Sequence, residues 1–333
     1  MSVRGADLLL STAPFERAPT TTPRVMLEVL GAALLVLLVS CWRFGAGAPL
    51  LVAAACAGAV GTEWVFSRSY EESTLRDYSA LVAGVLLGLT LPPGLPLWMA
   101  FLGGVAGVGL GKLVWGGLGQ NLFNPALVGR AFLQAAFPIA MTTWTAPVAP
   151  GGWLSVPQSL TALPLMRADV DAVSAATPLG LAKFESQLTD VGPLFFGSTS
   201  GSLGETHAVL LLGCGLWLGA RRIFEWRLPV ATLASVALAS GALHAIRPEV
   251  CPPPQFMLLS GGLMFAAVFM VTDPVTTPTT PRGAWLFGLG VGLLVVLIRV
   301  FGGLPEGVMY AILLMNAATP HINRRTQPRP FGG

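Results

Sequence analysis

The chain has 333 residues, of which 53% are hydrophobic and only 11% are charged. A soluble domain carries roughly 25% charged residues, so a mean hydropathy of +0.70 excludes an ordinary soluble fold. The formal net charge is only +3, so we do not expect the chain to bind nucleic acid. We expect it to lie in a lipid bilayer. Its four cysteines are scattered, without a C-x-x-C pair, so we expect neither an iron–sulfur cluster nor another metal site held by this chain alone.

Apolar runs long enough, or nearly long enough, to cross a hydrocarbon core of about 30 Å follow one another along the whole chain. They fall at 25–41, 48–66, 78–91, 97–115, 124–141, 207–220, 228–246, 255–272, 284–300 and 307–320. The third and the last are short. We therefore predict an all-α integral membrane protein with about ten transmembrane helices.

The distribution of positive charge predicts the orientation. Most of the 19 lysines and arginines fall in segments that share one side when the N-terminus is placed inside. The positive-inside rule then puts both termini in the cytoplasm and the one long loop on the extracytoplasmic side. The predicted parts are a cytoplasmic segment 1–24, a first membrane half 25–141, the loop 142–206, a second membrane half 207–320 and a cytoplasmic tail 321–333.

Five spans on each side of the loop make any internal repeat inverted in the membrane. A faint sequence echo supports such a repeat. Pro92-Pro93, Trp98, Gly116-Gly117-Leu118 and Asn124 are paralleled by Pro278 and Pro281, Trp285, Gly302-Gly303-Leu304 and Asn316. The alternative explanation is that Pro, Gly and Trp recur at helix ends in any membrane protein. A stripe of Gly103, Gly107 and Gly111 at four-residue spacing predicts close packing of one helix on its neighbour.

Four charged residues in or near the predicted spans are candidates for a functional role. Arg130 lies within one, where a guanidinium costs at least ~2.5 kcal/mol and is usually paired or functional. Arg130 and Asn124 could line a flavin or ion pocket, or Arg130 could form a structural pair with a neighbouring helix. Glu63, Asp273 and Glu306 are the carboxylates nearest span ends; they are candidates for an ion pathway, or ordinary residues of the membrane interface.

The predicted outer loop contains Asp171-Ala172-Val173-Ser174-Ala175-Ala176-Thr177. By itself this is a polar loop of small residues with a threonine. It resembles the D-x-x-[ST]-[GA]-A-T site at which a flavin transferase moves FMN from FAD onto a threonine through a phosphoester. With the ten runs, the position of the loop and the Asn-x-x-Asn-Pro-Ala stretch at 121–126, nearly the whole chain resembles the family of Rnf complex D subunits (RnfD). That family is related to the B subunit of the Na⁺-translocating NADH:quinone reductase, whose longer N-terminal extension this chain lacks.

The resemblance implies a role for each position of the motif. Thr177 would carry covalent FMN, Asp171 and Ser174 would be recognised by the transferase, and Ala175 and Ala176 would let the transferase approach. A second, non-covalent flavin such as riboflavin is a further possibility that the resemblance raises. The flavin would carry electrons, so no residue of this chain is expected to be catalytic in the sense of an acid, base or nucleophile.

The function implied is that of a redox subunit of an ion-translocating ferredoxin:NAD⁺ oxidoreductase in a bacterial inner membrane. Partners of the Rnf type would complete it: a second covalent-flavin subunit, two small membrane subunits, and iron–sulfur and NAD-side subunits. Electron flow would be coupled to movement of Na⁺ or H⁺. The alternative from another class is a stand-alone channel or secondary transporter for a small solute, suggested by the inverted halves and the proline-interrupted spans.

Overall fold

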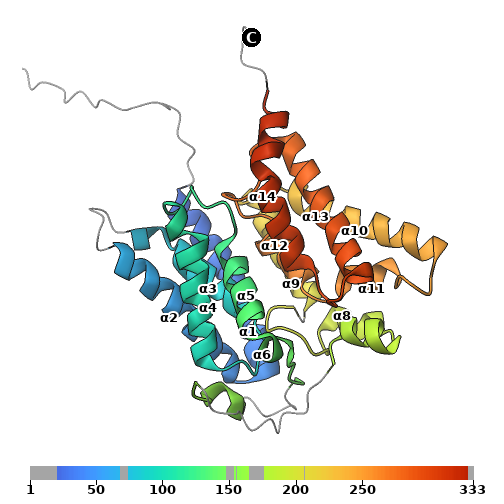
Figure 1. Cartoon of the computed structure of the whole chain (residues 1–333), viewed down its shortest axis with the longest axis horizontal. Helices are drawn as coiled ribbons and strands as arrows, with labels where there is room; N and C mark the ends of the chain where they lie inside the picture. Colours follow the sequence, from blue (N-terminus) through green and yellow to red (C-terminus); the bar gives the residue numbers. More distant parts are fainter. Residues whose placement is uncertain are drawn as a thin grey trace, which may run out of the picture.

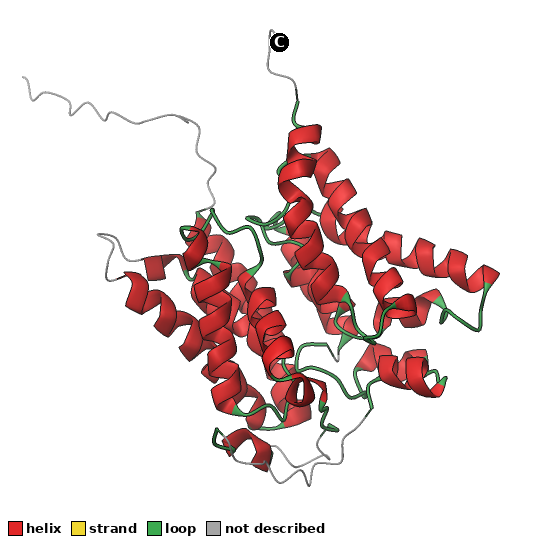
Figure 2. Cartoon of the chain, viewed as in Figure 1, coloured by secondary structure: helices red, strands yellow, loops and turns green. Residues whose placement is uncertain are grey.

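The computed structural model describes residues 21–67, 74–147, 154, 156–164, 176–205 and 207–328. In these ranges the chain consists of helices and the loops that join them (Figure 2). Of the predicted flavin motif, Ala176 and Thr177 are described, whereas Asp171, Ser174 and Ala175 lie outside the described residues.

The first group of helices comes from the first part of the chain and is blue to green in Figure 1. Its long helices are α1 (Thr22–Phe44), α2 (Gly47–Ser67), α3 (Ser79–Leu89), α4 (Leu97–Gly111) and α5 (Pro125–Ala136). Short helical turns accompany them: η1 (Thr74–Asp77), η2 (Leu113–Trp115) and α6 (Pro138–Thr142).

The second group, yellow to red in Figure 1, lies beside the first. It contains α9 (Ala208–Ala220), α10 (Arg227–Ile246), α11 (Pro254–Leu259), α12 (Leu263–Phe269), α13 (Pro281–Phe301) and α14 (Val308–Thr326). The segment between the groups contributes the short elements η3 (Gln158–Thr161), α7 (Pro178–Gly180), η4 (Leu181–Glu185) and α8 (Val191–Phe196).

Packing inside the two groups follows the same order. In the first group α2 packs most extensively on α4, and α4 also packs on α5; in the second, α10 packs most extensively on α13, and α13 packs on α14. Glycines allow this close approach in both. A Cβ on Gly104 of α4 would lie 2.2 Å from the Ala55 carbonyl oxygen of α2, and one on Gly292 of α13 would lie 2.6 Å from that of Thr232 of α10. The predicted glycine stripe is confirmed, because a Cβ on Gly107 would lie 2.7 Å from the Pro125 carbonyl oxygen.

The two groups meet along α1 and α9, which run antiparallel. Near the start of α1, Glu28 accepts two hydrogen bonds of 2.7 Å from Arg221, which follows the last residue of α9. Near the end of α1, Arg43 Nε lies 3.4 Å from His207 Nε2, just before α9 begins. These two helices therefore point in opposite directions, as an inverted repeat would require of such a pair.

Each predicted apolar run coincides with a helical segment, but not all of them form one continuous helix. In the part of the chain that the structure describes, five helices are long and apolar enough to cross a membrane by length and composition: α1, α2, α4 extended through η2, α10 and α13. Many of their large apolar side chains face outward, such as Leu38 at 65% and Leu238 at 72% exposure, as a lipid-facing surface would have them. The chain is thus a multi-pass helical membrane protein.

Two runs are broken where proline and glycine interrupt the helix. The run 255–272 divides into α11 and α12 around Ser260, Gly261 and Gly262, and Gly261 has a positive φ of 65° that favours glycine. The run 124–141 ends its main helix at Ala136, because Pro138 cannot continue the backbone hydrogen bonding. The predicted correspondence between Asn124 and Asn316 is wrong, because Asn124 caps α5 whereas Asn316 lies inside α14.

Candidate functional site: a charged cavity between the two helix groups

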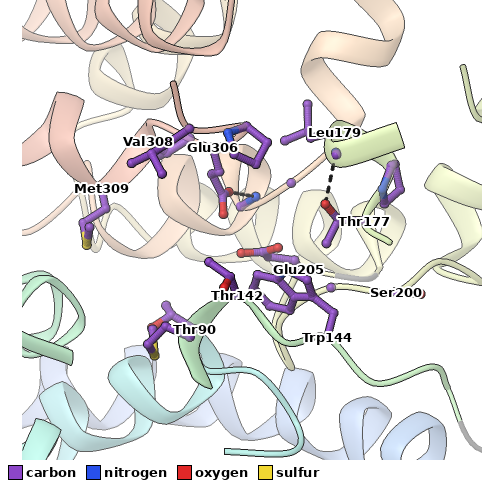
Figure 3. Close-up of a pocket in the computed structure, with 18 of the residues that line it drawn as sticks. Thr90, Thr142, Trp144, Thr177, Leu179, Ser200, Glu205, Glu306, Val308 and Met309 are labelled. Carbon is purple, nitrogen blue, oxygen red and sulfur yellow. Dashed lines mark hydrogen bonds between the residues drawn. The ribbon is translucent and has the colours of Figure 1, made fainter. Parts of the chain in front are cut away.

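A cavity of about 440 Å³ lies between the two groups and is covered by the segment that joins them. Figure 3 shows Thr177, Trp144 and Glu205 around one space, with Glu306, Val308 and Met309 on another side of it. Most of the lining is apolar, and a few polar groups converge on it, which is typical of small-molecule sites. The volume also lies within the range of roughly 300–1,000 Å³ for such sites.

Arg130 reaches this cavity from α5, whose first turn is capped by Asn124. The Asn124 side chain accepts hydrogen bonds from the Ala126 and Leu127 amides, and Pro125 occupies the first turn, so α5 begins with a well-formed cap. Further along the helix, Arg130 Nη1 donates to the Thr90 carbonyl oxygen at 2.7 Å. Thr90 ends α3, where a carbonyl has no partner within its own helix, so Arg130 satisfies an interrupted helix end.

Two carboxylates face the same guanidinium. Arg130 Nη2 donates to Glu306 Oε2 at 3.2 Å, and Arg130 Nη1 lies 3.6 Å from Glu205 Oε1. Glu306 Oε1 also accepts a hydrogen bond from the Gly262 amide, at the start of α12 (Figure 3). The side chains are 11% exposed for Arg130, 8% for Glu205 and 21% for Glu306, so all three interact largely out of water.

Arg299 adds a second buried cation from α13. Its Nη1 donates to the Met257 carbonyl oxygen at 2.6 Å and its Nη2 to that of Ser260 at 3.0 Å, at the end of α11. Arg299 thus stabilises the break in the second group, as Arg130 does the end of α3 in the first. A Cβ on Gly261 would lie 3.1 Å from Arg299 Nη2 and 3.0 Å from a Glu306 oxygen, so the two charges are neighbours.

We refer to Arg130, Glu205, Arg299 and Glu306 as the arginine cluster. The net charge of the cluster is zero when both carboxyl groups are ionised, because it holds two guanidinium groups and two carboxylates. Burial raises the pKa of Glu205 to about 7; the negative charge of Glu306 adds to the rise and Arg130 opposes it. Burial therefore favours the protonated form of Glu205.

Thr177 lies at the rim of the cavity as the N-cap of α7, where its Oγ1 accepts a hydrogen bond of 3.1 Å from the Gly180 amide. Lys183, in the following element η4, anchors the segment to the second group. Its Nζ donates to the carbonyl oxygens of Arg299 at 2.9 Å, of Leu304 at 3.0 Å and of Gly302. These carbonyls lie at and just beyond the end of α13, so the lysine satisfies groups that the helix leaves free.

The other predicted residues lie elsewhere. Asn124 and Asp273 line a second cavity of about 80 Å³, near the start of α1, so Asn124 and Arg130 do not share one pocket. Asp273 accepts hydrogen bonds from the Val275 amide and the Thr276 hydroxyl, which stabilise the turn after α12.

Glu63 belongs to a separate buried group, which we call the lysine cluster: Glu63, Asp77, Ser79 and Lys112. Lys112 Nζ lies 2.6 Å from both Glu63 Oε1 and Ser79 Oγ, and 3.9 Å from Asp77 Oδ2. The Glu63 side chain is 0% and the Lys112 side chain 2% exposed. All four residues come from the first helix group.

The sequence singled out Arg130 and Glu306 but not their partners. Glu205 stands in a Gly-Glu-Thr stretch before α9 that shows no motif, and nothing in the sequence around Lys183 and Arg299 singles them out. Their roles depend on contacts between segments far apart in the chain. Among the described residues, no group of three or more His, Cys, Asp or Glu side chains could hold a metal ion.

The fold and the site define a class of protein: a helical membrane protein with two helix groups and a charged cavity between them. The chain belongs to the NQR2, RnfD, RnfE family, whose model matches residues 9–332. It is 40% identical to the D subunit of the ion-translocating oxidoreductase complex of Stutzerimonas stutzeri, over 94% of this chain and 93% of that protein. It is 36% identical to the D subunit of the proton-translocating ferredoxin:NAD(+) oxidoreductase complex of Clostridium ljungdahlii, over 97% and 96% of the two chains. The identity is also 36% to the D subunit of an ion-translocating oxidoreductase complex of Escherichia coli, over 97% and 98%.

Proposed function

We propose that this chain is the membrane redox subunit of an Rnf-type complex and carries FMN on Thr177 through a phosphoester. The complex would pass electrons between ferredoxin-side and NAD-side partners and couple them to translocation of Na⁺ or H⁺. Membership of the family and the names of relatives matched along nearly their full length support this assignment.

The observation that carries the flavin proposal is the position of Thr177 on a cavity of suitable size and lining. A group attached to Oγ1 at the rim can enter a space of about 440 Å³. Aromatic side chains line that space at several points, among them Trp144, Phe184 and Phe265, and such rings suit the faces of a planar ring system. A bound flavin would supply one- and two-electron transfer, and the protein would fix its position and electrostatic surroundings.

The chain's own residues would hold the attachment segment and shape the charge beneath it. Thr177 caps α7, and Lys183 ties the following turn to α13. Arg130 and Arg299 place positive charge beside the cavity, which favours an electron-rich occupant, while Glu205 and Glu306 moderate that charge. In the same proposal Asp171, Ser174, Ala175 and Ala176 form the sequence that a flavin transferase recognises.

The topology belongs to the proposal too. Ten transmembrane segments in two inverted five-helix halves would cross a bacterial inner membrane, with both termini in the cytoplasm and the segment 142–206 outside. The antiparallel packing of α1 on α9 supports the inversion. Arg43, near the end of α1, donates to the carbonyl oxygen of Phe196 in the joining segment at 3.2 Å, which supports opposite sides for the N-terminus and the flavin segment.

A second, non-covalent flavin such as riboflavin is included as a proposal. The cavity of about 80 Å³ beside Asn124 would have to widen to hold an isoalloxazine ring. Among the three carboxylates considered for ions, Glu306 lines the larger cavity, whereas Glu63 is engaged by Lys112 and Asp273 by its own turn. An ion route beside Glu306 is therefore the one these contacts favour.

The test is a denaturing gel viewed under ultraviolet light, with the chain co-expressed with a flavin transferase. We expect a fluorescent band for the wild type, none for Thr177→Ala, and an unchanged band for Thr142→Ala. Thr142 is a matched control because it lines the same cavity outside the motif. A dark wild-type band, with the transferase active on another substrate, would refute the covalent flavin and favour a stand-alone transporter.

A further inference from the structure

The carboxylates of Glu205 and Glu306 converge on one point above Gly262. A Cβ placed on Gly262 would lie 2.8 Å from Glu205 Oε1 and 2.8 Å from Glu306 Oε1. The two oxygens therefore lie within one shared space that only a glycine leaves open. Glu205 reaches it from the segment before α9, and Glu306 from the segment before α14.

One oxygen of this pair has no hydrogen bond among the described residues. Glu205 Oε1 is buried and its closest cation, Arg130 Nη1, lies 3.6 Å away, beyond hydrogen-bond distance. A buried acceptor without a donor is costly, and a proton on that oxygen would remove the cost by neutralising the charge and supplying a donor. The other Glu205 oxygen accepts a long hydrogen bond of 3.5 Å from the Ser202 amide.

Several elements packed against the pair contribute to its electrostatics. The charged or titratable groups that face it or share its cavity are Arg130 from α5, Arg299 from α13, Glu185 from η4 and Tyr310 from α14. Glu205 Oε1 offers one buried oxygen without a donor, which is enough to bind a proton but too few ligands to coordinate a metal cation such as Mg²⁺ or Ca²⁺, which takes six or more oxygens.

We propose that Glu205 and Glu306 form a proton-binding pair that takes up one proton when an electron enters the adjacent cavity. The proposal rests on the proposed function for the electron carrier, which Thr177 would hold. The pair itself belongs to this chain and can be examined without the carrier.

The step balances in charge and atoms. One electron from a reduced iron–sulfur donor adds one negative charge to the cavity. One proton from water forms an O–H bond on the pair, so a carboxylate becomes a carboxylic acid and the net charge of cavity and cluster is unchanged. Reoxidation reverses both. Burial beside the cavity makes the coupling strong, because a charge there is poorly screened by water.

The first experiment uses the full chain made without a flavin transferase. Infrared spectra recorded from acid to alkaline pH report the C=O band of a protonated carboxyl group. We expect a band that titrates near neutral pH in the wild type, is lost in Glu205→Gln, and persists in Asp190→Asn. Asp190 is an exposed carboxylate of the same outer segment, outside the cavity lining. The proposal would be overturned if the wild type showed no such band. It would also be overturned if the band were unchanged in both Glu205→Gln and Glu306→Gln.

The second experiment uses the flavin-loaded chain, reduced with dithionite in a redox titration at several pH values. The flavin's own protonation contributes equally to wild type and variant. We expect the one-electron midpoint potential of the wild type to fall by up to about 59 mV more per pH unit than that of Glu205→Gln, because a tenfold change in proton concentration equals that voltage for one electron. Equal slopes would overturn the coupling. If Glu205→Gln does not fold, Glu306→Gln replaces it.

The two experiments separate the two possible failures. A chain without any covalent flavin contradicts the proposed function and leaves the infrared result on the pair valid. A chain with flavin but equal slopes contradicts the coupling and leaves the redox assignment standing.

Discussion

The lysine cluster and the arginine cluster are both buried, yet they differ in where their residues come from. Glu63, Asp77, Ser79 and Lys112 all belong to the first helix group, and the central contact is a direct one of 2.6 Å. The arginine cluster joins both groups, its Arg–Glu distances are 3.2 and 3.6 Å, and it borders a cavity of about 440 Å³. A closed pair within one group stabilises that group, whereas a looser set between two groups can respond to what occupies the space beside it.

The largest effect is expected in the lysine cluster. Lys112→Met would leave Glu63 charged in a site from which water is excluded, and breaking a buried pair in this way costs about 3–5 kcal/mol. We expect a strong fall in the thermal unfolding temperature in detergent. Glu63→Gln combined with Lys112→Met removes both charges and should recover much of the loss. A single variant as stable as the wild type would show that this pair does not hold the first group together.

An intermediate effect that depends on pH is expected for Arg130→Met. Without Arg130, the pKa of Glu205 in the folded protein rises further above its unfolded value. A carboxyl with a raised folded pKa destabilises the fold as the pH rises from about 4.5 through the folded value. The free energy of unfolding of the variant should therefore be about 2 kcal/mol below that of the wild type at pH 8, with a smaller difference at pH 5.

Thermal unfolding at the two pH values measures this difference. Arg247→Met, a change at an exposed arginine, serves as the control and should show no such pH dependence. A deficit of Arg130→Met that is the same at both pH values would mean that the guanidinium acts only as a partner of the Thr90 carbonyl.

The smallest effect is expected for Lys183, which ties the segment 176–205 over the cavity to α13. Lys183→Met removes the donor to three carbonyl oxygens at the end of α13. Because the site is partly exposed to water, the free energy of unfolding should fall by only about 1 kcal/mol. We expect faster proteolysis between residues 176 and 205 with little change in global unfolding. Lys183→Arg keeps a donor there and should cleave more slowly than Lys183→Met. Equal cleavage rates for the wild type, Lys183→Met and Lys183→Arg would show that Lys183 does not hold this segment in place.

The sequence predicted a helical membrane protein correctly, because hydrophobic runs depend on local composition. The bounds of α10 and α13 differ from the predicted runs by a few residues at most. The break between α11 and α12 was missed, although Ser260-Gly261-Gly262 could have signalled it, because the run around it is uniformly apolar.

The candidate site was predictable only in part. Arg130 was found because a charge within an apolar run is conspicuous. Glu205 and Lys183 were not found, because a charge in a polar segment looks ordinary until folding buries it. Thr177 was singled out by a motif and not by physical chemistry, since nothing in the spacing of its neighbours predicts that it borders a cavity.

The cap of α7 bears on how the protein could mature. Thr177 Oγ1 acts as an acceptor in the hydrogen bond that the structure describes, from the Gly180 amide. An ester at that oxygen replaces the hydroxyl proton but keeps lone pairs on Oγ1. The modified side chain could then accept the same hydrogen bond, and the turn that presents it would not have to be rebuilt after the transferase leaves.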